Sequence, residues 1–405
     1  MAKSSAPAQQ AARLAQMLRE AMGFHQTGRL VEAENLYAKV LRADPRQFDA
    51  QHLFGILRGQ QGRFEDAARH LAGALKANPN VPAAHVNYGL VLARLGRPQE
   101  ALTSLDKALA LQPDNAEALS HRGNVLCDLG RFEEAVRGYD RALAVRPQNP
   151  DVLNNRGSAL GALGRFEEAL ASYDQALAQR PQFPDALANR GSALGALGRF
   201  EEALASYDKV LALGGGGAQV FFNRGNALGG LKRFEEALVS YDRALALDPN
   251  RPEILDNRGN ALSELQRYEE ALASYAGALA LNPSYAGALA NRGRVLLDLE
   301  RHAEALESYD RALVLRPDDA EALNGRGTAL HALGRYREAI ASYDQALAIR
   351  PDYAEAHYNL GLVLAEQGRA EEALVHFNEA LRIKPDYAAA AAARHDLALV
   401  RAPAP

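Results

Sequence analysis

Very few residues of this chain combine the types and spacings that catalysis requires. The pattern Ser-x-x-Lys, in which a lysine stands near a serine nucleophile in some enzymes, occurs at Ser104 to Lys107 and at Ser206 to Lys209. Both stand at the same place in a repeated segment, where other copies read Ser-Tyr-Asp-Arg or Ser-Tyr-Asp-Gln. The ten histidines show no ligand spacing, and phosphate-loop, dinucleotide, zinc-protease and nucleophile-elbow motifs are absent from the sequence. We therefore predict no catalytic residue, no metal site and no cofactor.

Paired acidic residues and a single cysteine lead to the same prediction. Glu133 and Glu134 are adjacent at the start of a predicted helix, so their carboxylates point in different directions and cannot converge on a substrate. Dipole complementation and the nearby Arg131 explain them. Cys127 is the only cysteine, which excludes a disulfide framework and fits a reducing compartment. We interpret it as a small groove-lining or half-buried residue.

Composition and charge limit the classes of partner. The net charge is −4 over 405 residues, with no basic stripe, so nucleic acid and anionic membrane gain no support as partners. No signal peptide is evident near Met1, and no apolar run reaches the roughly 20 residues that span a bilayer. The cytoplasm is therefore the expected location, and residues 1–13 are expected to be a disordered N-terminal segment.

The dominant feature is a 34-residue repeat, which sets the elements that must position any functional side chain. Eleven blocks run without insertion or deletion from Leu14 to Tyr387. Glycine stands at position 8 in ten blocks, and proline at position 32 in ten, with Gly215 in the sixth. Alanine occupies position 20 of every block: Ala33, Ala67, Ala101, Ala135, Ala169, Ala203, Ala237, Ala271, Ala305, Ala339 and Ala373.

Each block predicts two helices. In the block 150–183, apolar residues recur at helical spacing, Gly164 marks a turn, and Pro181 ends the second helix. The small residues Gly157 and Ala169 allow the two helices to approach closely. One such pair cannot bury enough surface to fold alone, whereas stacked pairs can. We predict an all-α fold, an α-solenoid superhelix over residues 14–387, with residues 388–405 as a capping helix and tail.

The spacing of Gly at position 8, Ala at 20, an aromatic at 24 and Pro at 32 resembles the tetratricopeptide repeat family. The resemblance covers about 374 residues, and departs from the family pattern at position 4, usually Leu, and position 7, often Arg. It implies helix-turn-helix repeats and binding of other proteins. In the family, positions 2, 5, 6, 9, 12 and 13 of the first helix line a concave groove.

Position 6 of that groove carries a row of asparagines that His121 and Gly325 interrupt. An asparagine side chain offers donors and an acceptor, which suits the main chain of an extended peptide, and we favour this interpretation. Two alternatives are that the amides tie neighbouring repeats together, or that duplication copied them passively. The row consists of Asn87, Asn155, Asn189, Asn223, Asn257, Asn291 and Asn359.

Other predicted groove residues lie at positions 9, 5 and 2. Position 9 adds Asn124, Asn226, Asn260 and Arg294, and position 5 adds the apolar anchors Phe222 and Tyr358. Position 2 is acidic in seven blocks, which the helix dipole explains best and a preference for basic ligand segments explains less well.

Arginine at position 7 and aspartate at position 25 predict a structural ion pair. A charge near the core needs a partner, but the period allows the pair to form within a repeat or between repeats. Because Ala276 replaces aspartate in the eighth block, it deprives Arg258 of a partner in the first case and Arg292 in the second.

A run of glycines interrupts the repeat once. Gly214 to Gly217 replaces the junction that contains proline elsewhere, while the 34-residue count continues. We predict a soft joint between the sixth and seventh repeats, and not a domain boundary.

These features together predict a non-catalytic scaffold that binds an extended segment of a protein partner along the groove. The alternative is a substrate-recognition module for a separate glycosyltransferase, because the repeats resemble those preceding O-linked N-acetylglucosamine transferase domains. A self-assembling superhelix is a third possibility.

Overall fold

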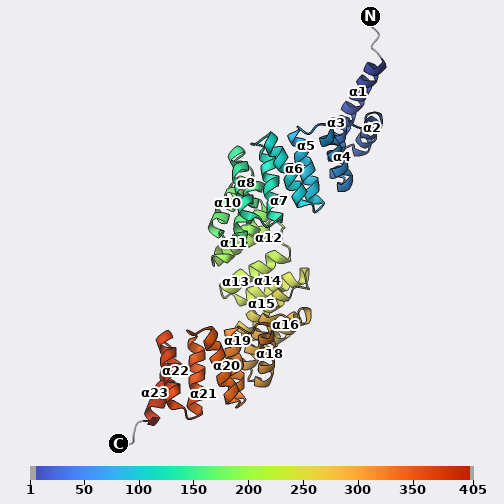
Figure 1. Cartoon of the computed structure of the whole chain (residues 1–405). Helices are drawn as coiled ribbons and strands as arrows, with labels where there is room; N and C mark the ends of the chain where they lie inside the picture. Colours follow the sequence, from blue (N-terminus) through green and yellow to red (C-terminus); the bar gives the residue numbers. More distant parts are fainter. Residues whose placement is uncertain (1–5, 402–405) are drawn as a thin grey trace. The chain divides into compact units, whose positions relative to one another are not determined.

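The computed structural model describes residues 6–401, in which every regular element is an α-helix. The chain divides into two compact units, residues 1–213 and 214–405. Figure 1 shows that each unit is built from consecutive pairs of antiparallel helices. The all-α repeat fold predicted from the sequence is therefore confirmed.

The helices of the first unit are α1 (Ala6–Gln26), α2 (Leu30–Ala43), α3 (Phe48–Gln60), α4 (Phe64–Ala77), α5 (Pro82–Arg94), α6 (Pro98–Leu111), α7 (Ala116–Asp128), α8 (Phe132–Val145), α9 (Pro150–Ala162), α10 (Phe166–Gln179), α11 (Pro184–Ala196) and α12 (Phe200–Ala212). Those of the second unit are α13 (Ala218–Gly230), α14 (Phe234–Leu247), α15 (Pro252–Glu264), α16 (Tyr268–Leu281), α17 (Ala286–Asp298), α18 (His302–Leu315), α19 (Ala320–Ala332), α20 (Tyr336–Ile349), α21 (Ala354–Glu366), α22 (Ala370–Ile383) and α23 (Ala388–Arg401).

The invariant small residues lie where two helices of a repeat meet. Alanine at position 20 is fully buried in all eleven repeats. The glycine at position 8 faces the aromatic ring at position 24: a Cβ on Gly157 would lie 2.5 Å from Cε1 of Tyr173. Such a contact is too short for a side chain, so glycine is required where the ring lies this close to the first helix, as at Gly157.

The turn between the two helices needs a residue in the left-handed region at position 15. Gly164 adopts φ = 73°, and the same turn in three successive repeats is made by Lys232, Gln266 and Glu300 at φ = 58–59°. A side chain in this conformation clashes with its own backbone. The turn is therefore kept by the packing of the helices, and not by glycine alone.

An exposed ion pair follows this turn in every repeat. The arginine at position 16 contacts the carboxylate at position 19, as in Arg131 with Glu134, where Nε and Oε1 are 2.6 Å apart. The arginine thus explains Glu134, as the sequence indicated. The other ten pairs are Arg29–Glu32, Arg63–Asp66, Arg97–Glu100, Arg165–Glu168, Arg199–Glu202, Arg233–Glu236, Arg267–Glu270, Arg301–Glu304, Arg335–Glu338 and Arg369–Glu372.

Within each unit, first helices of consecutive repeats approach each other within 8 Å between Cα atoms, as α15 and α17 do. Among residues 6–401, second helices of consecutive repeats within a unit do not come so close; α16 and α18 are an example. The stack is therefore shorter along its first helices. Each unit curves with these helices on its concave side, which is where the resemblance places the groove.

Both ends of the chain depart from or extend the repeat pattern. Helix α1 begins at Ala6, so the expectation of disorder over residues 1–13 is wrong from residue 6 onward; residues 1–5 lie outside the described range. The run Ala-Arg-Leu-Ala in this segment continues the helix of the first repeat. At the other end, α23 packs on α22, as predicted for a capping helix. No helix within residues 6–401 is both long and apolar enough to span a bilayer.

The division into units falls at the glycine run. Helix α12 ends at Ala212 and α13 starts at Ala218, and Gly216 takes φ = 141°, a conformation that other residues rarely adopt. The sequence located this break, but the prediction that it is not a boundary is wrong, because the chain separates there into two compact units. Four glycines supply no side chains to pack one repeat on the next.

Candidate functional site: the face of the first helices

All seven members of the asparagine row lie on first helices, and each is half-buried. Six of them use one amide N–H to donate a hydrogen bond to a side chain of the preceding repeat. The bonds, with donor–acceptor distances, are Asn87 to His52 (2.9 Å), Asn155 to Asn124 (3.0 Å), Asn189 to Asn154 (3.0 Å), Asn257 to Asn226 (2.8 Å), Asn291 to Asp256 (3.0 Å) and Asn359 to Asn324 (3.0 Å).

The position-9 asparagines complete these ties. The side-chain oxygen of Asn226 accepts from the hydroxyl of Tyr241, at 3.0 Å in its own repeat, and from Asn257 of the next. Asn124 accepts in the same way from Tyr139, at 2.7 Å, and from Asn155. Asn260 accepts from Tyr275 at 2.8 Å. Position 9 therefore joins the second helix of one repeat to the first helix of the next.

These contacts match the interpretation that the amides tie repeats together. They do not exclude ligand contact, since each asparagine has two amide hydrogens and an oxygen. The side-chain oxygen of Asn223, in the first repeat of the second unit, accepts from Gln219 at 2.8 Å. Contact with a peptide stays a prediction for the whole row.

The two aromatic residues proposed as anchors pack on rings of their own unit. The Phe222 ring lies 6.2 Å from the ring of Tyr241, and Tyr358 lies 5.1 Å from Tyr387. Both are half-buried. Each therefore offers part of one ring face to the groove, and their role as anchors stays a prediction.

Gly325 interrupts the asparagine row because an aromatic ring occupies the space of a side chain. A Cβ on Gly325 would lie 2.4 Å from Cζ of Tyr309, in the preceding repeat. Position 9 of that preceding repeat is Arg294, which has no acceptor for the tyrosine hydroxyl, unlike Asn226 or Asn260. The ring of Tyr309 is thus wedged between Gly293 and Gly325.

A polar pocket of about 460 Å³ opens beside this ring. It is lined by α17, α18 and α19 and by Tyr353 in the loop before α21. Arg294 reaches Asp298 only at 3.9 Å, and Arg316 makes no ion pair with any residue in the range 6–401. Burial raises the pKa of Tyr309, so its hydroxyl stays protonated at neutral pH and can donate. Two guanidinium groups and the Tyr309 hydroxyl therefore line one cavity together with the carboxylates of Asp319 and Glu321. Glu321 pairs with Arg350 and Asp319 accepts from the backbone N–H of Ala322, so the two guanidinium groups keep donors for an anionic or carbonyl group.

The acidic residues at position 2 are partly used inside the repeats. Asp151 accepts two hydrogen bonds from the guanidinium of Arg180, at 2.8 and 3.0 Å, and Arg180 lowers the pKa of this carboxyl. Glu321 lies 3.2 Å from Arg350 in the same relation. These contacts and the helix dipole explain why position 2 is acidic, so a preference for basic ligand segments is not needed to explain it.

The arginine at position 7 pairs with the aspartate of the preceding repeat. Nε of Arg258 lies 2.7 Å from Oδ1 of Asp242, which selects pairing between repeats. Each of four further arginines makes the same contact at 2.5–2.7 Å: Arg122 with Asp106, Arg156 with Asp140, Arg190 with Asp174 and Arg326 with Asp310. The structural role expected for this pair follows directly, because the bond crosses these five junctions on the side away from the groove.

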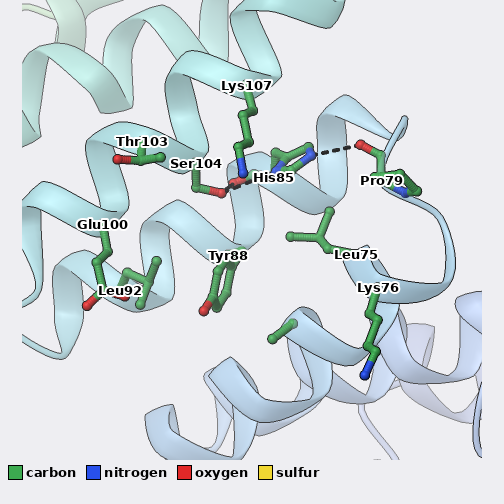
Figure 2. A pocket seen from close by; sticks show the side chains of 11 residues that line it. Leu75, Lys76, Pro79, His85, Tyr88, Leu92, Glu100, Thr103, Ser104 and Lys107 are labelled. Carbon is green, nitrogen blue, oxygen red and sulfur yellow. Dashed lines mark hydrogen bonds between the residues drawn. The ribbon is translucent and has the colours of Figure 1, made fainter.

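A second cavity of about 410 Å³ lies on that outer side, between α4, α5 and α6. Figure 2 shows His85 bridging to the backbone oxygen of Pro79, at 2.8 Å, with Tyr88 and Lys107 at its edge. Ser104, one of the two Ser-x-x-Lys serines, donates to the backbone oxygen of His85 at 2.9 Å. Its hydroxyl is thus part of the scaffold.

The remaining candidates for chemistry have structural contacts as well. Ser206 accepts from Arg190 at 2.9 Å and donates to the backbone oxygen of Glu202. Cys127 is half-buried with Sγ 3.6 Å from the hydroxyl of Tyr139, and burial raises the pKa of this thiol. No group of histidine, cysteine and carboxylate side chains within residues 6–401 has the arrangement of a metal site.

Comparison with known proteins identifies the repeat. Family models described as tetratricopeptide repeat or TPR repeat match residues 52–116, 114–182, 154–218, 218–251, 240–273, 257–320, 308–341, 327–368 and 354–387. The chain belongs to the tetratricopeptide repeat family. Proteins built from tetratricopeptide repeats generally mediate protein–protein interactions.

Solved tetratricopeptide-repeat structures share the fold. The crystal structure of the APC/C hetero-tetramer Cut9-Hcn1 matches with a TM-score of 0.51 and 15% identity, over 96% of this chain and 97% of that one. A tetratricopeptide repeat protein from Parabacteroides merdae matches at 0.48 and 19%, over 62% and 98%. YrrB, a TPR protein with an unusual peptide-binding site, matches at 0.41 and 26%, over 46% and 97%. No significant match is found among curated proteins.

Proposed function

We propose that the chain is a non-catalytic scaffold that binds an extended segment of a protein partner along the first helices, with its main contact at the Arg294 pocket. The observation that carries this proposal is the pocket itself. It lies at Gly325, one of the two interruptions of the asparagine row, and the guanidinium groups of Arg294 and Arg316 both line its cavity. Arginine donors of this kind bind carboxylates and main-chain carbonyls.

The asparagines on either side of the pocket extend the contact. Asn291 and Asn359 each donate one N–H to the preceding repeat, which leaves a second N–H and the side-chain oxygen for a ligand. An extended peptide presents unpaired N–H and C=O groups along its length, which amide side chains can bind. We therefore expect the ligand to be unfolded and to carry an acidic or polar side chain at the pocket.

Site-specific photocrosslinking tests this proposal. A photoreactive amino acid at position 294 faces the groove, while one at Val314, which is 81% exposed on the second helix α18, is the matched control. Crosslinks to a partner from position 294, and none from position 314, support the groove. Equal yields from both positions would refute it.

The glycosyltransferase alternative remains a hypothesis about the partner. Incubation with sugar nucleotide and peptide, with this chain alone, should give no turnover. Any transfer would contradict a non-catalytic scaffold.

A further inference from the structure

The ion pairs that cross the outer side of the repeats define a slot between consecutive repeats. In a complete slot, the aspartate at position 25 accepts from the arginine at position 7 of the next repeat. That arginine then donates through Nη1 to the serine at position 23 of its own repeat. Arg258 shows both bonds, at 2.7 Å to Asp242 and 2.6 Å to Ser274. Arg156 and Arg326 repeat the arrangement.

One slot in the second unit lacks its aspartate. Ala276 stands at position 25 of the eighth repeat, and Arg292 of the ninth makes neither of the two bonds with any described residue. The hydroxyl of Ser308, which a complete slot would pair with Arg292, is fully buried and has no hydrogen-bond partner in the structure. A buried hydroxyl without a partner is costly. The slot therefore lacks the carboxylate that the complete slots contain. Arg292 and Ser308 also lack the hydrogen bonds that the equivalent residues make there.

The vacant slot is a cavity of about 580 Å³ between α16, α17 and α18. Its wall on α16 is apolar and includes Leu272, Ala276 and Leu279. Three guanidinium groups line it, from Arg292, Arg301 and Arg311, of which Arg301 already pairs with Glu304. Glu269 is the only acidic residue that lines the cavity, so the cationic side chains outnumber the anionic ones.

We propose that this slot binds an acidic side chain of a protein partner, whose carboxylate takes the place that an aspartate at position 276 would fill. The other slots show that a carboxylate is what this geometry accepts. The leucines beside the slot favour a carboxylate that belongs to an amphipathic polypeptide segment over a free ion, because the cavity extends well beyond one charged group. This surface is separate from the groove of the first helices and does not depend on it.

The slot at Ala72 provides an internal comparison. It also lacks the aspartate and also holds a cavity, but Tyr88, labelled in Figure 2, stands at the position that the arginine occupies in a complete slot. Because this slot lacks the guanidinium group at position 7, we expect it not to bind a carboxylate preferentially. Among residues 6–401, the Ala276 slot is the one that lacks the acid and whose arginine makes no hydrogen bond, since the equivalent Arg394 donates to the side-chain oxygen of Asn378 at 3.2 Å.

The test uses the full chain and two synthetic peptides of alternating Leu and Glu or alternating Leu and Gln, titrated by calorimetry. The wild-type protein should bind the Glu peptide at least tenfold more tightly than the Gln peptide. Ala276→Asp fills the slot with the chain's own carboxylate and should remove this preference, while its unfolding midpoint rises. Asp242→Ala opens an equivalent slot at Arg258 and should raise the number of Glu peptides bound.

Each other result overturns the proposal. If Ala276→Asp binds the Glu peptide as tightly as the wild type, the slot is not the site. If Arg294→Ala abolishes binding and Ala276→Asp does not, the peptide lies in the groove, and the groove proposal stands without this one. If inorganic phosphate binds and the Glu peptide does not, the slot is a small-anion site. Circular dichroism of each variant confirms that it is folded.

Discussion

The ties formed by asparagine side chains can be measured as pairwise energies. The side-chain oxygen of Asn226 accepts from Tyr241 and Asn257, at 3.0 and 2.8 Å, and these bonds connect three helices of two repeats. Three substitutions probe them: Asn257→Ala removes one donor, Tyr241→Phe removes the other, and Asn226→Ala removes the shared acceptor.

The expected costs follow from burial. A hydrogen bond of this kind contributes about 1 kcal/mol, so Asn257→Ala and Tyr241→Phe should each lower local stability by about that amount. The Tyr241 side chain is only 3% exposed, so Asn226→Ala leaves a buried hydroxyl without a partner. Its cost should reach about 2–3 kcal/mol. The coupling energy of Asn226 with Asn257 should be about 1 kcal/mol.

Native-state hydrogen exchange of the amides in α13 to α16 is the assay. It reports local opening free energies, which suits a repeat array that need not unfold in one step. Asn257→Ala combined with Asn226→Ala should cost little more than Asn226→Ala alone. Additive costs, with a coupling energy near zero, would refute the view that these amides tie the repeats together.

Three further predictions concern single positions. Burial raises the pKa of Asp256, so the charged carboxylate is disfavoured in the folded state. The free energy of unfolding therefore falls as the pH rises through the pKa of the folded state, and it is unaffected below the pKa of the unfolded state. Asp256→Asn should therefore raise the calorimetric unfolding midpoint at pH 7 but not at pH 3, and an unchanged midpoint at pH 7 would contradict this. Lys232 is held at φ = 59°, so Lys232→Gly should stabilise the chain by about 0.5–1 kcal/mol in urea unfolding, and a loss would show that the turn is unstrained. Gly157→Ala should cost about 1–3 kcal/mol because of the Tyr173 ring, whereas Gly161→Ala, with no atom within 4 Å, should not destabilise; equal effects would contradict the packing argument.

The repeat register was predictable because it rests on side-chain size. Alanine at position 20 and glycine at position 8 recur where the two helices touch, and a Cβ at most of these glycines would collide with the side chain at position 24, a tyrosine, phenylalanine or leucine. The curvature could be predicted only through family resemblance, since it depends on how closely first and second helices approach in space. The helical start of α1 was missed because a short polar segment with alanine carries no strong signal.

The site was predictable in position but not in contacts. A period of 34 places the arginine at position 7 equally well 18 residues before one aspartate or 16 residues after another. Only coordinates could select Arg258 with Asp242. The asparagine row follows from the repeat count, but its bonds to the preceding repeat could not be read from the sequence. The packing of Tyr309 against Gly325 could have been suspected from the sequence, because Arg294 replaces the asparagine that accepts from the tyrosine hydroxyl in other repeats. That replacement can be interpreted only when the asparagine–tyrosine hydrogen bonds are known.

The central claim is that the concave face binds an extended segment of a partner. The most direct test takes the segment that crosslinks to position 294, synthesises it as an isolated peptide, and measures its Kd for the wild type, Arg294→Ala and Val314→Ala. We predict that the unfolded peptide binds, that Arg294→Ala weakens it about tenfold, the loss of roughly one charge-assisted hydrogen bond, and that Val314→Ala has no effect. A peptide that binds all three proteins equally, or none of them, would contradict the claim.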